Sequence, residues 1–254
     1  MNRQIVAPVI VVTFVILAGC VGGSSDLTSQ SPTDADDGSD GDVTLVENRT
    51  AALMAAGSYT AVWQMSFLNA SEGESWLTYT NAVNFDDERS TFDMRTASDG
   101  VESTAYESFQ GDGVSYTRYG TGEDATYSVR DAPFTPTNTL FPVESYVSSG
   151  GLSEFSAAGT ETYDGVTVTR YERTDRPAWI GQQGSDAEIT WTEFSYVVLV
   201  DADGLVRYES WGAEGVDADD GEHGMAFSYA LTGVGSTAVD DPDWLGAADA
   251  QSNR

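Results

Sequence analysis

"HGMAFSYALT", residues 223–232, alternates large apolar side chains with small or polar ones. Successive side chains of a β-strand point to opposite faces of the sheet, so this period of two predicts a strand with one buried face. The large residues on that face are Met225, Phe227, Tyr229 and Leu231. Such alternation is typical of an antiparallel sheet, because parallel strands are buried on both faces and appear as continuous apolar runs.

The same period recurs through most of the chain. "SYTAVWQMSF", residues 58–67, and "LTYTNAVNF", residues 77–85, alternate in this way. In residues 101–110 the alternation leaves open whether Tyr106 or Phe109 faces the core. The other alternating stretches are residues 89–96, 113–119, 124–130, 161–174, 188–200 and 204–212. The sequence therefore predicts a mainly β (α+β) protein built from antiparallel strands.

Short stretches rich in Asp and Gly separate these strands. "GDGV", residues 111–114, and "YDGV", residues 163–166, place a glycine where a tight hairpin needs a positive φ. "VDADGLV", residues 200–206, carries an Asp-x-Asp-Gly pattern that also occurs in calcium loops. Turn chemistry accounts for both of its aspartates, so we interpret this stretch as a hairpin.

Two helices interrupt the strand pattern. "TLVENRTAALMAAG", residues 44–57, has Thr44 and Glu47 at the spacing of a capping box, and Gly57 where a helix would end. A short middle helix is predicted from Pro142 to Ser149, because proline favours the first helical position.

The charge of the chain is extreme, with 41 acidic against 11 basic residues and a net charge of −30. All of the basic residues are arginine. Nucleic-acid binding needs a cationic surface, so the composition excludes a nucleic-acid partner. Acidic residues spread through every loop are typical of a halophilic surface, because the Debye length in molar salt is only about 3 Å. Capture of a cationic ligand is the alternative, which the even spread of charge disfavours.

The N-terminal segment has the layout of an export signal. Residues 1–20 run from a short polar start into an apolar stretch that is shorter than the roughly 20 residues of a membrane-spanning helix. "LAGC", residues 17–20, resembles the lipobox of secreted lipoproteins, which implies removal of the signal peptide 1–19 and lipidation of Cys20. Cys20 is the only cysteine, so it has no disulfide partner. An uncleaved anchor is the alternative. Both place the protein at the cell membrane, facing the extracellular side.

The remainder divides into a linker, one domain and a tail. Residues 20–42 carry the lipidated cysteine and an acidic Gly/Ser/Asp-rich linker. The linker's run "DADDGSDGD", residues 34–42, lacks the glycine and glutamate that an EF-hand needs at fixed positions. We expect a single β-rich domain over residues 43–245 and a flexible tail over residues 246–254.

No catalytic, cofactor-binding or metal-binding motif is found. The single histidine, His223, would have to serve any serine-type triad, and no G-x-S-x-G motif occurs. One histidine and one cysteine do not make a typical zinc site, and there is no P-loop or dinucleotide fingerprint. We therefore expect a protein that is not an enzyme and that needs neither cofactor nor metal.

Two N-x-[ST] sequons are candidates for N-glycosylation of an exported chain. "NAS" begins at Asn69, at the end of a predicted strand, and "NRT" begins at Asn48, inside the predicted helix. Of the two, Asn69 is the better candidate.

Several stretches together resemble an uncharacterised family of haloarchaeal surface lipoproteins. They are the lipobox, "AALMAAGSYT" at residues 51–60, "VDADGLV" at 200–206 and "DPDWL" at 241–245. Their architecture is similar to the lipoprotein-carrier and mycobacterial lipid-carrier fold. That likeness implies a half-barrel, which is a single curved antiparallel sheet of about 10–11 strands. It also implies that the N-terminal helix and the short middle helix pack on the concave side, around an apolar cavity.

Two functions follow from this interpretation. The first is a membrane-anchored extracellular lipoprotein that binds or carries an apolar or amphiphilic, lipid-like ligand in the half-barrel cavity. The candidate cavity residues are Trp63, Phe67, Tyr79, Phe85, Phe227 and Tyr229. The alternative is a structural or protein-interaction module of the cell envelope, with a filled core and other envelope proteins as partners.

Overall fold

The computed structural model describes residues 44–136, 147, 151–177, 180 and 189–252. Residues 42–254 belong to one compact unit. Its strands are β1 (Ser58–Asn69), β2 (Gly73–Asn84), β3 (Arg89–Ser98), β4 (Val101–Gly111), β5 (Val114–Tyr119), β6 (Thr126–Asp131), β7 (Ser156–Tyr163), β8 (Val166–Arg173), β9 (Thr190–Asp201), β10 (Val206–Val216) and β11 (Glu222–Thr232). Its helices are α1 (Arg49–Ala56), the 3-10 turn η1 (Gly122–Asp124) and α3 (Leu245–Ser252).

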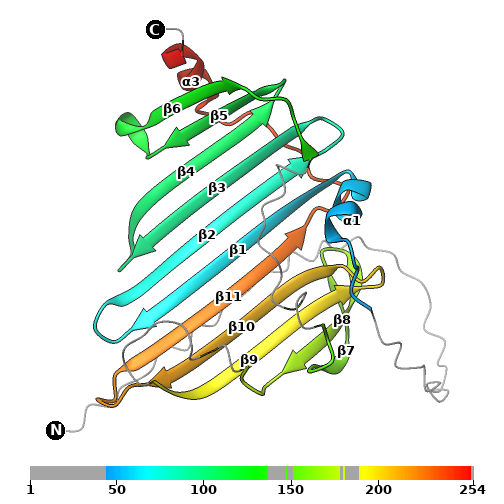
Figure 1. The fold of residues 1–254 in the computed structure, drawn as a ribbon, viewed down its shortest axis with the longest axis vertical. Coiled ribbons are helices and arrows are strands. Elements are labelled where there is room, and N and C mark those ends of the chain that lie inside the picture. The colour runs from blue at the N-terminus through cyan, green and yellow to red at the C-terminus, as the bar shows by residue number, and fades with distance from the viewer. Residues whose placement is uncertain (1–43, 137–146, 148–150, 178–179, 181–188, 253–254) are drawn as a thin grey trace, which may run out of the picture. The chain divides into compact units, whose positions relative to one another are not determined.

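In this described part of the chain, the eleven strands form one antiparallel sheet (Figure 1). Their order is β6-β5-β4-β3-β2-β1-β11-β10-β9-β8-β7, so two meanders join where β1 pairs with β11. The sheet is open, with β6 and β7 at its edges. The predicted fold class, a mainly β protein with a single antiparallel sheet of this size, is confirmed.

Three of the hairpins turn on an Asp-Gly pair. The pairs begin at Asp99, Asp112 and Asp164, and both residues of each pair have a positive φ, between 49° and 78°. This conformation belongs to the type I′ turn, whose twist matches that of the flanking strands. The predicted hairpins at "GDGV" and "YDGV" are confirmed. Residues 161–174, which we expected to form one strand, instead contain the turn between β7 and β8.

Helix α1 begins later than the sequence indicates. Its N-cap is Asn48, whose Oδ1 accepts the Ala51 N–H at 2.9 Å. The capping box expected at Thr44 is wrong, because the chain before Asn48 is held against the turn between β9 and β10. There the Val46 N–H donates to the Gly204 carbonyl at 2.9 Å.

The predicted end of α1 at Gly57 is confirmed. Gly57 has a φ of 84°, and its N–H donates to the Met54 carbonyl at 3.2 Å. Leu53 is the buried residue of this helix. It joins a core in which α1 covers one face of the sheet around Trp63, and we call this the inner face. The predicted N-terminal helix is therefore present and packs on one face of the sheet.

A second core lies on the opposite face of the sheet, which we call the outer face. It contains Phe109 of β4 together with Val239, Trp244 and Ala248 of the C-terminal segment. The strand registers fix its position. The inner residue Trp63 pairs with Tyr79, Tyr79 with Met94, and Met94 with Tyr106. Phe109 is three residues beyond Tyr106, so it points to the other face.

Residues 246–254 were expected to form a flexible tail, but Leu245–Ser252 form α3, which lies against β5 and β6 (Figure 1). The middle helix expected from Pro142 to Ser149 lies outside the described residues, except for Val147, which is buried in the inner core.

Candidate functional site

A row of aromatic side chains crosses the inner face of four neighbouring strands. It consists of Tyr79 of β2, Phe92 of β3, Tyr106 of β4 and Tyr119 of β5, and we call it the aromatic ladder. The ring centroids are 5.8, 5.9 and 5.2 Å apart along this row. The first pair is stacked and the other two meet edge to face, which are the geometries that aromatic pairs favour.

The ladder is only partly covered. Tyr79, Phe92 and Tyr106 are half-buried, and Tyr119 is 52% exposed. The helix that covers β5 and β6, α3, packs on the outer face instead. Phe67, 37% exposed on β1, adds a further aromatic ring to the inner face. Large apolar side chains thus meet solvent along the inner face of β1–β5.

The six predicted cavity residues separate into two groups. Trp63, Phe227 and Tyr229 are at most 3% exposed and form part of the inner core. Trp63 packs on Tyr229 with their centroids 5.4 Å apart. Tyr79 and Phe85 are half-buried at the border of that core, and Phe67 is exposed. The structure thus brings three of the candidates together in the buried inner core, places Tyr79 and Phe85 at its margin and leaves Phe67 exposed.

Sequence reasoning missed three members of the ladder as candidate site residues: Phe92, Tyr106 and Tyr119. The signal that could have found them is the strand register. The two-residue Asp-Gly turns between β3 and β4 and between β4 and β5 fix which residues face each other, and so bring the aromatic residues of these three strands into one row.

Polar groups are built into the inner core beneath α1. Glu209 of β10 is fully buried and accepts a hydrogen bond from the Tyr196 hydroxyl. Arg49 of α1 donates to the Tyr229 hydroxyl, and its guanidinium carbon lies 5.0 Å from the centre of the Tyr229 ring. Burial raises the pKa of Tyr229, although the nearby Arg49 opposes that shift. Tyr229 therefore remains a neutral phenol and links α1 to the sheet.

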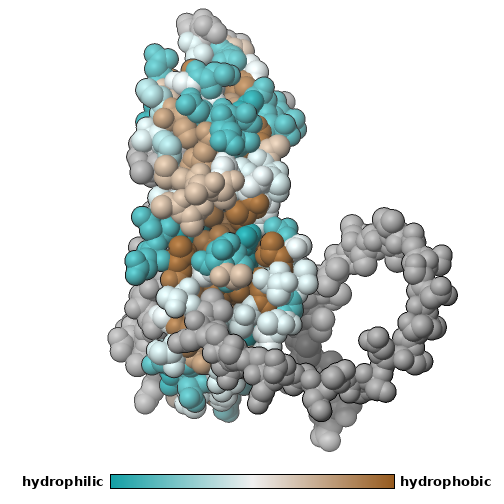
Figure 2. Space-filling model, turned by 90° about the vertical axis from the view of Figure 1, so that its right-hand side faces the viewer, coloured by the Kyte–Doolittle hydropathy of each residue, from teal (hydrophilic) through white to brown (hydrophobic). Residues whose placement is uncertain are grey.

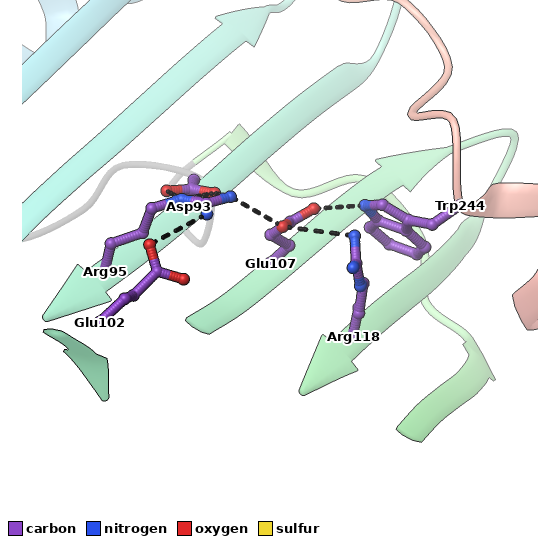
Figure 3. Close-up of polar contacts among 6 residues, drawn as sticks. All are labelled: Asp93, Arg95, Glu102, Glu107, Arg118 and Trp244. Carbon is purple, nitrogen blue, oxygen red and sulfur yellow. Dashed lines mark hydrogen bonds and ion pairs between the residues drawn. The ribbon is translucent and has the colours of Figure 1, made fainter. Parts of the chain in front are cut away.

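A charged cluster on the outer face joins three strands and the C-terminal segment (Figure 3). Glu107 of β4 lies 3.0 Å from the guanidinium of Arg95 and 3.5 Å from that of Arg118, and it accepts the Trp244 indole N–H. Arg95 also pairs with Asp93 at 2.9 Å and with Glu102 at 3.5 Å. The Asp93 hydrogen bond is the largest reason why the pKa of Arg95 is raised. The cluster fixes Trp244 in the outer core.

The turn between β9 and β10 confirms that "VDADGLV" is a hairpin. One Asp201 carboxylate oxygen accepts the N–H groups of Asp203 at 3.0 Å and Leu205 at 2.9 Å. The other oxygen accepts the Arg207 Nε–H at 2.6 Å in a buried ion pair. Both oxygens of the Asp201 carboxylate therefore accept hydrogen bonds within the hairpin.

His223, the second residue of β11, contacts a second carboxylate-capped turn, between β10 and β11. Its Nε2 is 2.9 Å from Asp217 Oδ2, while Asp217 Oδ1 accepts the N–H groups of Asp219 and Gly221. The hydrogen bond with His223 is the main reason why the pKa of Asp217 is lowered, and the two backbone donors add to it. The buried imidazole thus stabilises a turn.

Among the residues that the structure describes, no group of three His, Cys, Asp or Glu side chains is placed to hold a metal ion. Within the same residues, no helix combines the length and the apolarity needed to cross a bilayer.

Figure 2 shows hydrophobic residues gathered at mid-height on the side of the molecule that lies to the right in Figure 1.

The fold and the site define a mainly β protein with one open antiparallel sheet whose inner face carries a half-exposed aromatic row. The chain belongs to DUF7537, a family of unknown function whose sequence profile matches residues 5–248. No curated protein sequence matches it.

Solved structures give distant similarities. The lipoprotein LppX from Mycobacterium tuberculosis is 10% identical, with 77% of this chain and 100% of that chain covered and a TM-score of 0.35. LprF from Mycobacterium bovis is 9% identical, with coverage of 78% and 98% and a TM-score of 0.29. A LolA superfamily protein from Nitrosomonas europaea is 10% identical, with coverage of 76% and 95% and a TM-score of 0.21.

Proposed function

We propose that the protein is a membrane-anchored extracellular lipoprotein that binds an apolar or amphiphilic, lipid-like ligand along the inner face of its sheet. One observation carries this proposal. The aromatic ladder presents half-exposed rings of Tyr79, Phe92, Tyr106 and Tyr119 in one continuous row.

The ladder is suited to such a ligand because it exposes apolar area in a contiguous strip. Covering apolar surface is favourable by about 25 cal/mol per Å². A contiguous exposed apolar patch, unlike scattered single residues, is typical of a binding site. The three tyrosines add a hydroxyl to each ring, so the strip can accept apolar chains and still hydrogen-bond a polar group.

We do not place the ligand in a closed cavity around the residues predicted from the sequence. Trp63, Phe227 and Tyr229 already fill the space beneath α1. We therefore place the ligand beside that core, over β2–β5, where Tyr79 marks the border between the two regions.

A matched pair of variants tests ligand binding. Tyr106 and Tyr208 are both half-buried and both contact another aromatic ring, but Tyr106 lies on the inner face and Tyr208 on the outer face. We expect Tyr106→Ser to weaken binding of a fluorescent fatty-acid probe about 5- to 10-fold, because an aromatic contact contributes roughly 1–1.5 kcal/mol. Tyr208→Ser leaves the affinity unchanged. The measurement is a fluorescence titration in molar salt, with a chain that begins at Asp42.

The test has a clear negative outcome. If the wild-type chain does not bind the probe, or if both variants lose the same affinity, ligand binding on the inner face is wrong. Mass spectrometry of the same sample under native conditions would detect a lipid that remained bound through purification.

The membrane anchor of the proposal is a lipid on Cys20, since residues 17–20 resemble a lipobox and the chain has a single cysteine. A two-chain lipid gives stable anchoring, at about 0.8 kcal/mol for each buried methylene group. We expect Cys20→Ser to stop signal removal and to move the protein out of the lipid-modified fraction. Metabolic labelling with a radioactive lipid precursor measures this, and unchanged labelling would contradict the anchor.

An envelope structural or protein-interaction module is the second candidate. The burial of Trp63, Phe227 and Tyr229 against one another in the inner core favours it, because these side chains are covered by protein without a ligand. Crosslinking in intact cells, followed by mass spectrometry, should in that case return a defined envelope protein. The same experiment returns no defined protein if the ladder serves a lipid-like ligand.

A further inference from the structure

The turn between β1 and β2 presents a complete glycosylation sequon on the surface. Asn69 is the last residue of β1, and Ala70, Ser71 and Glu72 form an exposed turn before Gly73. Asn69 Oδ1 accepts the Ser71 N–H at 2.9 Å and the Ser71 hydroxyl at 2.8 Å. The Glu72 N–H donates to the Asn69 carbonyl at 3.2 Å and closes the turn. The side-chain amide and the hydroxyl of the sequon are thus held together at the tip of a hairpin.

The reactive atom of the sequon is free. Both side-chain hydrogen bonds go to Oδ1, and within the described residues Asn69 Nδ2 makes no hydrogen bond. Turn residues with no core contact can carry a bulky group that extends into solvent, which is the usual position of an N-linked glycan.

The other sequon is held in a different way. Asn48 caps α1 through Ala51, and the residue between Asn48 and Thr50 is Arg49. Arg49 is bound to the Tyr229 hydroxyl and stacked on its ring at 5.0 Å. Presentation of residues 48–50 to an enzyme would require the first turn of α1 to unwind. Helix α1 would then lose the contact between Arg49 and Tyr229 and an N-cap worth about 1 kcal/mol.

We propose that Asn69 carries an N-linked glycan and that Asn48 does not. The inference rests on the extracellular location in the proposed function, but not on ligand binding. The co-substrate is an oligosaccharide joined to a lipid carrier through phosphate. Asn69 Nδ2 attacks the anomeric carbon and loses one proton as the new C–N bond forms. The C–O bond to the phosphate breaks, and the lipid phosphate leaves with the electron pair.

Intact-mass spectrometry and peptide mapping of the full chain, purified from the organism that encodes it, test the proposal. We expect one glycan for each wild-type chain. Asn69→Gln and Ser71→Ala should lose the whole carbohydrate mass. Asn48→Gln should keep it, and so should Ser71→Thr, which preserves the hydroxyl of the sequon.

The negative outcomes are separable. A chain that has no glycan but is digested by protease added to intact cells overturns the glycan alone, whereas a chain that has no glycan and resists that protease until the cells are lysed also overturns the extracellular location. Loss of the glycan in Asn48→Gln with retention in Asn69→Gln overturns the assignment. Because the Asn69 side chain accepts two hydrogen bonds within the turn, Asn69→Gln could fail to fold. Ser71→Ala keeps the backbone hydrogen bond and decides the question in that case.

Discussion

The two halves of the sheet bury opposite faces. In β1 and β8–β11 the inner face is covered by α1 together with residues such as Phe155 and Ile180, and the core there is centred on Trp63 and Tyr229. In β4–β6 the outer face is covered by α3 and the segment before it, with Phe109 and Trp244 at the centre. Among the residues that the structure describes, α1 lies over β1 and α3 over the outer face of β5 and β6, so neither helix lies over the aromatic ladder on the inner side of β2–β5.

The two helices are attached to the sheet in related ways. In each attachment a charged side chain hydrogen-bonds to an aromatic one. Arg49 of α1 donates to the Tyr229 hydroxyl, and Glu107 of β4 accepts the indole N–H of Trp244, which comes just before α3. The first attachment ends on Tyr229, which is buried in the inner core, whereas the second is part of a charged cluster that reaches the surface. Burial strengthens an electrostatic contact and raises the cost of breaking it, so the α1 side should be the more stable half.

The largest expected effect is that of Trp63→Ala, which opens a cavity in the inner core. A buried tryptophan truncated to alanine costs roughly 3–5 kcal/mol of unfolding free energy. Tyr119→Ala, at the exposed end of the ladder, serves as the control and should cost less than about 1 kcal/mol. Chemical denaturation in molar salt measures both. Equal losses of unfolding free energy would show that the inner face is buried as deeply at β5 as at β1, and would contradict the difference between the two halves.

Trp244→Ala should have the next largest effect. It removes the main side chain of the smaller outer core and leaves Glu107 without its indole donor, at a cost of roughly 2–3 kcal/mol. Hydrogen exchange should rise in β5 and β6 and stay unchanged in β9–β11. A uniform rise across all strands would mean that the two halves unfold as one unit.

Glu107→Gln tests the charged cluster on the outer face of the α3 half. Glu107 contacts Arg95, Arg118 and Trp244, so loss of its charge should cost roughly 1–2 kcal/mol. Glu102→Gln removes the same charge from an exposed side chain with one ion pair at 3.5 Å, and should cost less than about 0.5 kcal/mol. Thermal unfolding of the two variants measures the difference. If both shift the midpoint equally, the cluster contributes only net charge.

The alternating pattern predicted the strands well, because period two and Asp-Gly turns are local properties of the sequence. It could not say which face of each half would be covered. Residues 101–110 illustrate this, since Tyr106 and Phe109 are both large and the pattern left the choice open. The structure uses both, Tyr106 in the ladder and Phe109 in the outer core. The choice depends on which helix packs there, which is a long-range property.

The helices show the same limit. The end of α1 was predictable, because Gly57 adopts a positive φ within the local chain. Its start was not, because the contact between Val46 and Gly204 joins segments far apart in the sequence. Helix α3 gave little signal, since only Ala248 of its eight residues is buried. The aromatic ladder was equally hard to predict from the sequence, because each of its four strands contributes only one ring.

The smallest expected effect concerns acid stability at the turn between β10 and β11, which belongs to the α1 half. Hydrogen bonds from His223, Gly221 and Asp219 lower the pKa of Asp217 below the ordinary aspartate value of about 3.9. A carboxyl with a lowered folded-state pKa adds stability above its unfolded pKa, and that stability is lost as the pH falls through the folded value. The wild-type protein should therefore lose stability below about pH 4, and Asp217→Asn should lose less over that range.

Denaturant midpoints at pH 6 and pH 3 measure this difference in molar salt, where long-range charge repulsion is screened. Asp219→Asn removes a charge from the same turn but keeps the pair between Asp217 and His223, so it is the control and should follow the wild type. If Asp217→Asn also follows the wild type, acid acts elsewhere. The many carboxylates of this chain would then titrate as one surface, and the turn would not distinguish the α1 half from the α3 half.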